Sequence, residues 1–401
     1  MTIDAFDTAV HGHCDPAFKG VREVLEESFA RGRDLGAAVA VYAGDRLVAN
    51  LWGGVADHRA GRPWEEDTPC FAFSCTKALT ATAALLLAER GAYDLEAPVA
   101  GWWPEFAAEG KDRVTAEQVL SHQAGLPALA RPVSAEEAAD PAAMAAMLAA
   151  QAPEWTPGET HGYHALTFGW LAGEIVRRHA GRPVGAFVRE EFAGDLDLWI
   201  GSPPEVVERA AKLTARRPAA ARDLGPAPAE PQPTGANGDT ALARLARATR
   251  EQIDLMNRAF NNPHPGKGGY NNPVVLAAGW PGAGMVTTAT GLAGFYRDLI
   301  AGRVLRPETL REALRPRVSG PDRVMLNDSA FGLGYMRPSM SYFTPAAGAA
   351  TAFGHNGAGG SLGLGDVEAG IAVAYLPNLM GGEPAGDTRA YRIAEAVYAS
   401  L

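Results

Sequence analysis

Two residues three positions apart, Ser74 and Lys77, could together activate a hydroxyl nucleophile. They lie in the run FSCTK at residues 73–77, directly before an apolar stretch that predicts a helix over residues 78–90. Residues three apart on a helix share one face, and a lysine whose pKa is lowered by desolvation can take the proton of a serine hydroxyl. The alternative is that Ser74 caps the helix and Lys77 is solvated.

A tyrosine, Tyr163, stands in the run PGETHGYH at residues 157–164, before a helix expected over about 166–179. A tyrosine on the loop that precedes a helix can point back into a cleft. Beside a lysine ammonium its phenolate form is favoured, which would make it a usable general base. The alternative is a half-buried tyrosine whose hydroxyl is bonded to a nearby group.

A third candidate is the glycine-rich run FGHNGAGGS at residues 353–361. Glycines this dense let a ligand approach the backbone closely. Backbone N–H groups in this run could complete an oxyanion hole together with the N–H of Ser74. The alternative is a plain glycine-rich turn.

Two further patterns suggest other chemistry and fail on their context. GGSLG around Ser361 spells G-x-S-x-G, which requires a following helix and a later histidine, but a strand hairpin is expected next and His355 is the last histidine. His161 and His164 form H-x-x-H without a third ligand at a matching spacing, so no metal is expected. We expect no cofactor.

The elements expected around these residues come from both ends of the chain. Alternation and turn residues predict an N-terminal hairpin (residues 37–42 and 47–52) and a C-terminal hairpin (361–365 and 371–376). Amphipathic helices are expected over residues 17–32 and 388–398, and the middle of the chain is mostly helical. The fold class is therefore α+β: an antiparallel sheet flanked by helices, with an inserted helical domain.

The expected boundaries follow from this layout. A discontinuous sheet domain comprises residues 1–70 and 280–401. A mostly helical domain, residues 71–279, carries the Ser-x-x-Lys helix and a proline-rich loop at about 213–240.

Composition excludes several classes of partner. The net charge is −10 with scattered basic residues, which disfavours nucleic acids and anionic membranes. No segment approaches the roughly 18 consecutive apolar residues of a membrane helix. Three cysteines do not make a disulfide framework, and the acidic N-terminus lacks signal-peptide features. We expect a cytoplasmic protein acting on a small-molecule ester or acyl substrate, with its oligomeric state open.

The three candidate segments together resemble the serine β-lactamase and penicillin-binding protein superfamily, most closely the family VIII carboxylesterases, which are similar to class C β-lactamases. LSHQAGL at residues 120–126 resembles the family's LSHxSGL segment, and GAGMVTT at 282–288 its GGxxST segment. The resemblance implies a β-lactamase-like fold. Its implied site residues are Ser74 as nucleophile, Lys77 as its partner, Tyr163 as general base, the N–H groups of Ser74 and Ala358 as oxyanion hole, and His355, Asn356 and Gly357 as substrate-binding residues.

Two departures from the family pattern bear on the substrate. The asparagine of the family's Y-x-N element is Ala165 here, and the lysine of its K-T-G strand is His355. The resemblance then implies an esterase acting through a Ser74 acyl-enzyme, with weak or absent β-lactam turnover. If His355 titrates near pH 6.5, lactam activity would rise at lower pH. An acyltransferase of secondary metabolism and a β-lactamase or D-amino-acid peptidase are the alternatives.

Overall fold

The fold was analysed in a computed structural model that describes residues 8–215, 234–235, 238–381 and 387–401. The N-terminal acids and most of the expected loop at 213–240 lie outside these ranges. The expected helices are present at nearly the expected places, and the closing helix α13 spans Thr388–Tyr398.

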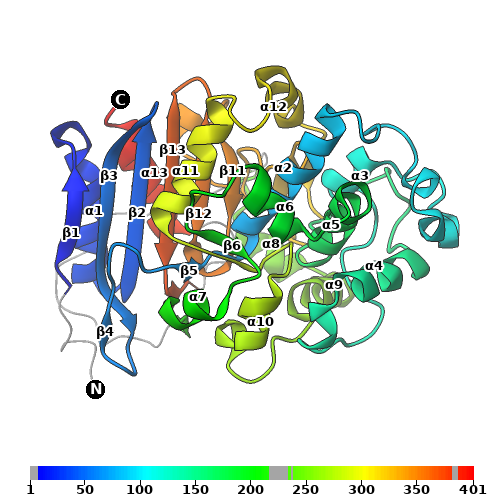
Figure 1. The fold of residues 1–401 in the computed structure, drawn as a ribbon, viewed down its shortest axis with the longest axis horizontal. Helices are drawn as coiled ribbons and strands as arrows, with labels where there is room; N and C mark the ends of the chain where they lie inside the picture. Colours follow the sequence, from blue (N-terminus) through cyan, green and yellow to red (C-terminus); the bar gives the residue numbers. More distant parts are fainter. Residues whose placement is uncertain (1–7, 216–233, 236–237, 382–386) are drawn as a thin grey trace.

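The main sheet is assembled from both ends of the chain (Figure 1). The N-terminal hairpin β2–β3 lies beside the C-terminal hairpin β12–β13, with β13 antiparallel to β2 and Tyr375 opposite Val39. One edge is formed by β1, a strand not expected from the sequence, and the other by β11. The strands are β1 (Val10–Cys14), β2 (Gly36–Ala43), β3 (Arg46–Asp57), β4 (Arg62–Pro63, paired with β3), β11 (Phe353–Asn356), β12 (Leu362–Asp366) and β13 (Ile371–Pro377).

Helices cover both faces of this sheet, which is why its central strands are buried on both sides. The helix α11 (Ala289–Ile300) packs against β2, β12 and β13. On the opposite face α1 (Lys19–Ala30) and α13 pack against each other (Figure 1). Accordingly every residue of β13 is buried.

The helix α2 (Thr76–Glu89) is the centre of the helical region, and its residues 76–87 are all buried. It packs chiefly on α5 (Thr167–Ala180). The strand β5 (Cys70–Phe71) comes just before α2 in the chain and forms a short sheet with β8 (Met285–Thr287) and β6 (Leu198–Ile200). The other helices are α3 (Ala116–Leu120), α4 (Pro141–Ala150), α6 (Val184–Glu191), α7 (Pro204–Arg209), α8 (Ala241–Arg247), α9 (Arg250–Asn261), α10 (Pro273–Ala278) and α12 (Pro307–Leu314).

The fold class is α+β, as the sequence predicts. We propose that the division into a sheet domain and a helical domain also holds, with one qualification. The strands β9 (Val318–Pro321) and β10 (Asp328–Phe331) fall within the expected sheet domain but form a ribbon of their own, and that ribbon bonds to the loop carrying Tyr163. In the described residues no helix is long and apolar enough to cross a membrane.

Candidate active site

Ser74 stands in a short 3-10 turn, Phe73–Cys75, that leads directly into α2. The preceding residue, Phe73, has a left-handed backbone with φ of 49°, which is uncommon for a bulky residue and marks a constrained turn. Thr76 fixes this turn, because its hydroxyl donates to the Phe73 carbonyl at 2.5 Å and accepts the Met285 N–H at 3.0 Å. Ser74 alone in this turn is partly exposed, so its hydroxyl is the group that a substrate can reach.

Lys77 lies one turn further along, fully buried, with its Nζ 3.1 Å from the Ser74 Oγ. Its other hydrogen bonds go to the carbonyl oxygens of Ala165 at 2.6 Å and Gly282 at 2.8 Å. Burial lowers the pKa of Lys77 well below its ordinary value, and none of these three partners is a carboxylate that would restore it. A neutral amine would donate to the two carbonyls and keep its lone pair for the Ser74 hydroxyl.

Tyr163 completes the group. Its ring lies under Lys77, with the Nζ 4.8 Å from the ring centre, and its hydroxyl is 3.5 Å from the His355 Nε2. Burial raises the pKa of Tyr163, and a hydrogen bond with the Ser74 side chain opposes the rise only in part. The structure thus brings Ser74, Lys77 and Tyr163 together, with the tyrosine favoured as a neutral phenol.

The loop that carries Tyr163 is held by a buried carboxylate that the sequence analysis missed. Asp322 accepts the Tyr163 N–H at 3.0 Å and the Ser329 hydroxyl at 2.8 Å, together with two backbone N–H groups of its own turn. His122 supports the same loop by accepting the His164 N–H at 3.1 Å. Asp322 follows Pro321 in the sequence, and a Pro-Asp pair is typical of any surface turn. The sequence therefore contains no sign that Asp322 supports the active site.

His161 and His164 have separate structural roles in this loop. The His161 Nε2 lies 3.0 Å from the Ser329 hydroxyl. His164 is fully buried, with its Nε2 accepting the Leu126 N–H at 3.0 Å and its Nδ1 2.7 Å from the Gly162 carbonyl. Both ring nitrogens of His164 are therefore engaged by backbone groups, and burial lowers the pKa of His164 to about 3.

His355 lies on the edge strand β11 beside Tyr163 and is 1% exposed. Its Nδ1 faces the Asn356 carbonyl at 2.6 Å, which leaves Nε2 toward the Tyr163 hydroxyl. Burial, with the nearby Lys77, lowers the pKa of His355 to about 3. The condition for a rise of lactam activity at lower pH, titration of His355 near pH 6.5, is therefore not met. The Asn356 amide donates to the Ser341 carbonyl at 2.9 Å and so is engaged within the protein.

The turn after β11, which begins at Gly357, packs against the segment that carries Ser74. A Cβ on Gly357 would lie 2.5 Å from the Ala72 carbonyl and 3.1 Å from the Phe73 Cβ, so only glycine fits there. Ala358 follows and is exposed. Among the described residues, the N–H groups of Ser74 and Ala358 make no hydrogen bond to the protein, as an oxyanion hole requires.

Ser361 has a structural role. It is 2% exposed and its hydroxyl donates to the Ala72 carbonyl at 3.1 Å. The residue is followed by the strand β12 rather than a helix, which confirms that this G-x-S-x-G run is not a nucleophile elbow.

The fold and the serine site define a serine hydrolase of the β-lactamase-like type. The chain belongs to the Beta-lactamase family, whose sequence model matches residues 21–398. It is 34% identical over 382 residues to the esterase/beta-lactamase LipL of Mycobacterium tuberculosis (strain ATCC 25618 / H37Rv), a match that covers 92% of this chain and 83% of LipL.

Two solved structures are similar over almost the whole chain. A family VIII carboxylesterase superposes with a TM-score of 0.84 at 31% identity, covering 98% of this chain and 100% of the other. A penicillin-binding protein homolog from Caulobacter crescentus gives a TM-score of 0.81 at 35% identity, with the same coverage. The resemblance to family VIII carboxylesterases drawn from the sequence is thereby confirmed.

Proposed function

We propose that the protein is a carboxylesterase that hydrolyses small esters through an acyl-enzyme on Ser74. The observation that carries this proposal is the position of Lys77. Its Nζ is 3.1 Å from the Ser74 Oγ, and its other two bonds go to backbone carbonyls. In its neutral form an amine held in this way is placed to accept the proton of the Ser74 hydroxyl.

The first step is attack by Ser74 on the ester carbonyl. The Ser74 proton passes to the Lys77 amine while the Oγ–carbon bond forms and the carbonyl oxygen becomes an oxyanion. The ammonium produced remains bonded to the carbonyls of Ala165 and Gly282. The family resemblance implies Tyr163 as the general base; we propose Lys77 instead, because the raised pKa of Tyr163 disfavours a phenolate base.

The second step is departure of the alcohol. The neutral Tyr163 hydroxyl gives its proton to the leaving oxygen and recovers one from the Lys77 ammonium, so the Ser74 ester is left with a neutral lysine. Water then repeats the sequence in reverse and releases the carboxylic acid. The N–H groups of Ser74 and Ala358 stabilise the oxyanion in both halves.

The choice of esters follows from the two positions at which the chain departs from the family pattern. Ala165 contributes a methyl group where the family pattern has an amide. His355 is a buried neutral imidazole, already facing Tyr163 and its own backbone. A β-lactam's side-chain amide and carboxylate would find no amide or cation at these positions, and each unpaired polar group costs roughly 1–3 kcal/mol. A simple ester has neither group.

The substrate test compares kcat/KM for p-nitrophenyl butyrate and for nitrocefin, with Ser74→Ala as the background. We expect the ester to be the better substrate by on the order of tens to tens of thousands of fold, since two losses of that size combine at about 1.4 kcal/mol per tenfold. Nitrocefin as the better substrate would contradict the esterase proposal. Activity on neither, with acyl transfer from a thioester to an alcohol, would favour an acyltransferase.

The pH dependence of kcat/KM identifies the base. Lys77 must be neutral to act, so activity rises with pH through its lowered pKa. Tyr163 must be protonated to act as the acid. Because its pKa is raised, we expect kcat/KM not to fall with pH below about pH 10. His355, with a pKa of about 3, is neutral throughout pH 5–8. We expect the rising limb to be unchanged in His355→Gln; its disappearance would make His355 the base.

A further inference from the structure

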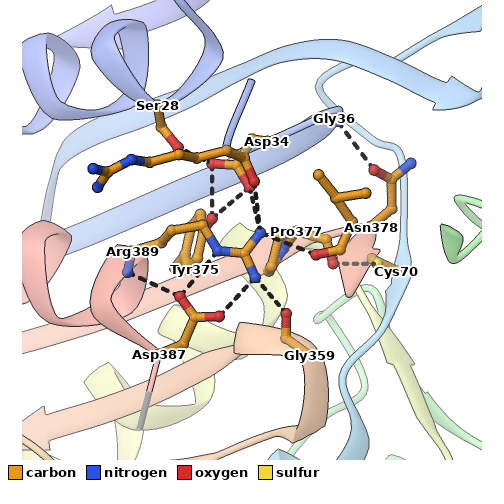
Figure 2. Close-up of polar contacts among 12 residues, drawn as sticks. Ser28, Asp34, Gly36, Cys70, Gly359, Tyr375, Pro377, Asn378, Asp387 and Arg389 are labelled. Atoms are coloured by element: carbon orange, nitrogen blue, oxygen red, sulfur yellow. Dashed lines mark hydrogen bonds and ion pairs between the residues drawn. The ribbon is translucent and has the colours of Figure 1, made fainter. Parts of the chain in front are cut away.

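A buried arginine at the start of α13 is bonded to the protein through every nitrogen of its guanidinium. Arg389 has a side chain only 8% exposed. Its Nε and Nη2 donate to the two oxygens of Asp387 at 2.9 and 2.7 Å, and its Nη1 donates to Asp34 at 2.9 Å (Figure 2). Such paired, charge-assisted bonds fix the plane of the guanidinium as well as its position.

Asp34 is itself held from the opposite side. Its carboxylate accepts the Ser28 hydroxyl at 2.5 Å and the Tyr375 hydroxyl at 2.7 and 2.8 Å, and its side chain is completely buried. Burial acts to lower the pKa of Arg389, but its neighbours Tyr375, Asp34 and Asp387 raise it on balance. The arginine is therefore a permanent charge anchored between α1, β13 and α13.

One contact of Arg389 reaches the glycine-rich turn beside the active site. Its Nη2 donates to the Gly359 carbonyl at 2.6 Å (Figure 2). The Gly381 N–H donates to the same oxygen at 3.0 Å. A Cβ on Gly360 would lie 2.5 Å from the Nη2. The guanidinium thus contacts the turn directly at Gly359, the residue after Ala358.

Backbone bonds within the turn join the Gly357 N–H to the Ser361 carbonyl at 2.7 Å and the Gly360 N–H to the Gly357 carbonyl at 3.1 Å. Neither of these bonds involves the Gly359 carbonyl, which accepts from Arg389 and from the Gly381 N–H. Gly359 and Gly360 have φ of 82° and 113°, a conformation that glycine adopts freely and leaves as freely. Gly357 abuts the Ser74 segment on one side, while Arg389 fixes the Gly359 carbonyl on the other. The peptide that bears the Ala358 N–H lies between these two points.

We propose that Arg389 is a positioning residue for the oxyanion hole, holding the Gly359 carbonyl so that the Ala358 N–H stays directed at the oxygen of the adduct on Ser74. This inference rests on the proposed function, which gives Ala358 its role. Donors fixed before the reaction lower the barrier because they need not reorganise as charge develops. A purely structural Arg389 would anchor α13 and leave the transition state unaffected.

The test compares Arg389→Lys with Tyr375→Phe. Lysine keeps the charge but cannot bond both carboxylates and the Gly359 carbonyl at once. Tyr375→Phe removes a bond to the same Asp34 without touching the turn. We expect Arg389→Lys to lower kcat about 10- to 100-fold with KM changed less than about threefold, as for a displaced oxyanion donor. In Tyr375→Phe, kcat should stay within about threefold.

A second readout separates positioning from loss of structure. Phenylboronic acid forms a reversible tetrahedral adduct on a serine nucleophile and places an oxygen in the oxyanion hole. Its inhibition constant should rise in Arg389→Lys by about the same factor as kcat/KM falls, as expected of a transition-state analogue. An unchanged inhibition constant, an unchanged kcat, or an equal loss in Tyr375→Phe would overturn the proposal.

Asp387→Asn provides a test should Arg389→Lys fail to fold. Asp387 accepts the Arg389 N–H at 2.8 Å as the N-cap of α13, and asparagine caps equally well. The variant keeps the N-cap of α13 and weakens the charge-assisted bond between residue 387 and the Arg389 Nη2. We therefore expect kcat to fall without a change in KM, and an unaltered kcat would refute the proposal. Wild-type protein with neither ester hydrolysis nor boronate binding would instead refute the proposed function.

Discussion

Replacing Ser74 with alanine should abolish ester hydrolysis, with kcat for p-nitrophenyl butyrate falling by on the order of 10⁴-fold or more. Two other candidate nucleophiles, Ser361 and Cys75, are both engaged within the protein. Ser361 is buried against the Ala72 carbonyl, and Cys75 is buried with its thiol directed at the His355 carbonyl at 3.2 Å. The measurement is steady-state hydrolysis with enzyme concentrations high enough to detect residual turnover.

The matched control for this variant is Ser361→Ala. It removes one hydroxyl of the same kind, a hydrogen bond worth roughly 1 kcal/mol of stability. We expect a lower melting temperature and kcat within about threefold of wild type, well short of the effect expected for a catalytic nucleophile. Loss of activity in Ser361→Ala with retention in Ser74→Ala would contradict the assignment.

The next largest effect is expected from Lys77 and Tyr163, which should act as one unit. Either Lys77→Met or Tyr163→Phe should lower kcat about a thousandfold, and the double variant should be little worse, because groups on one proton path lose activity non-additively. The geometry gives the reason: the lysine lies over the tyrosine ring, 4.8 Å from its centre, and both bond the Ser74 side chain.

Folding must be checked in these variants, since Lys77→Met leaves the carbonyls of Ala165 and Gly282 without their donor. Each unsatisfied buried carbonyl costs roughly 1–3 kcal/mol. Near-ultraviolet circular dichroism and thermal melting identify an unfolded variant. Strictly multiplicative losses in a folded double variant would show that the two residues serve separate steps.

The sequence predicted those parts of the fold whose signals are local. The two hairpins and the closing helix follow from alternation, turn residues and amphipathic spacing, and α13 begins and ends where expected, at Thr388 and Tyr398. The Ser74–Lys77 pair is local as well, since one helical turn brings the two together. Tyr163 could be assigned only through the family resemblance, because it lies 86 positions after Lys77 in the chain.

The parts that could not be predicted depend on contacts between distant segments. β1 has an exposed pattern with glycine and two histidines, and pairing with β3 alone makes it a strand. Asp322 and Arg389 are ordinary charged residues in the sequence. Their roles arise because the fold places one beneath the Tyr163 loop and the other beneath the Gly359 turn. The shift in His355 is likewise a consequence of burial.

Covalent labelling tests the central claim, that Ser74 is the nucleophile of an acyl-enzyme, most directly. The native protein is treated with a fluorophosphonate, digested, and analysed by peptide mass spectrometry. The account predicts a single adduct, on Ser74, which disappears in Ser74→Ala, forms slowly in Lys77→Met, and is prevented by prior incubation with phenylboronic acid. An adduct on Ser361, or continued labelling in Ser74→Ala at the wild-type rate, would contradict it.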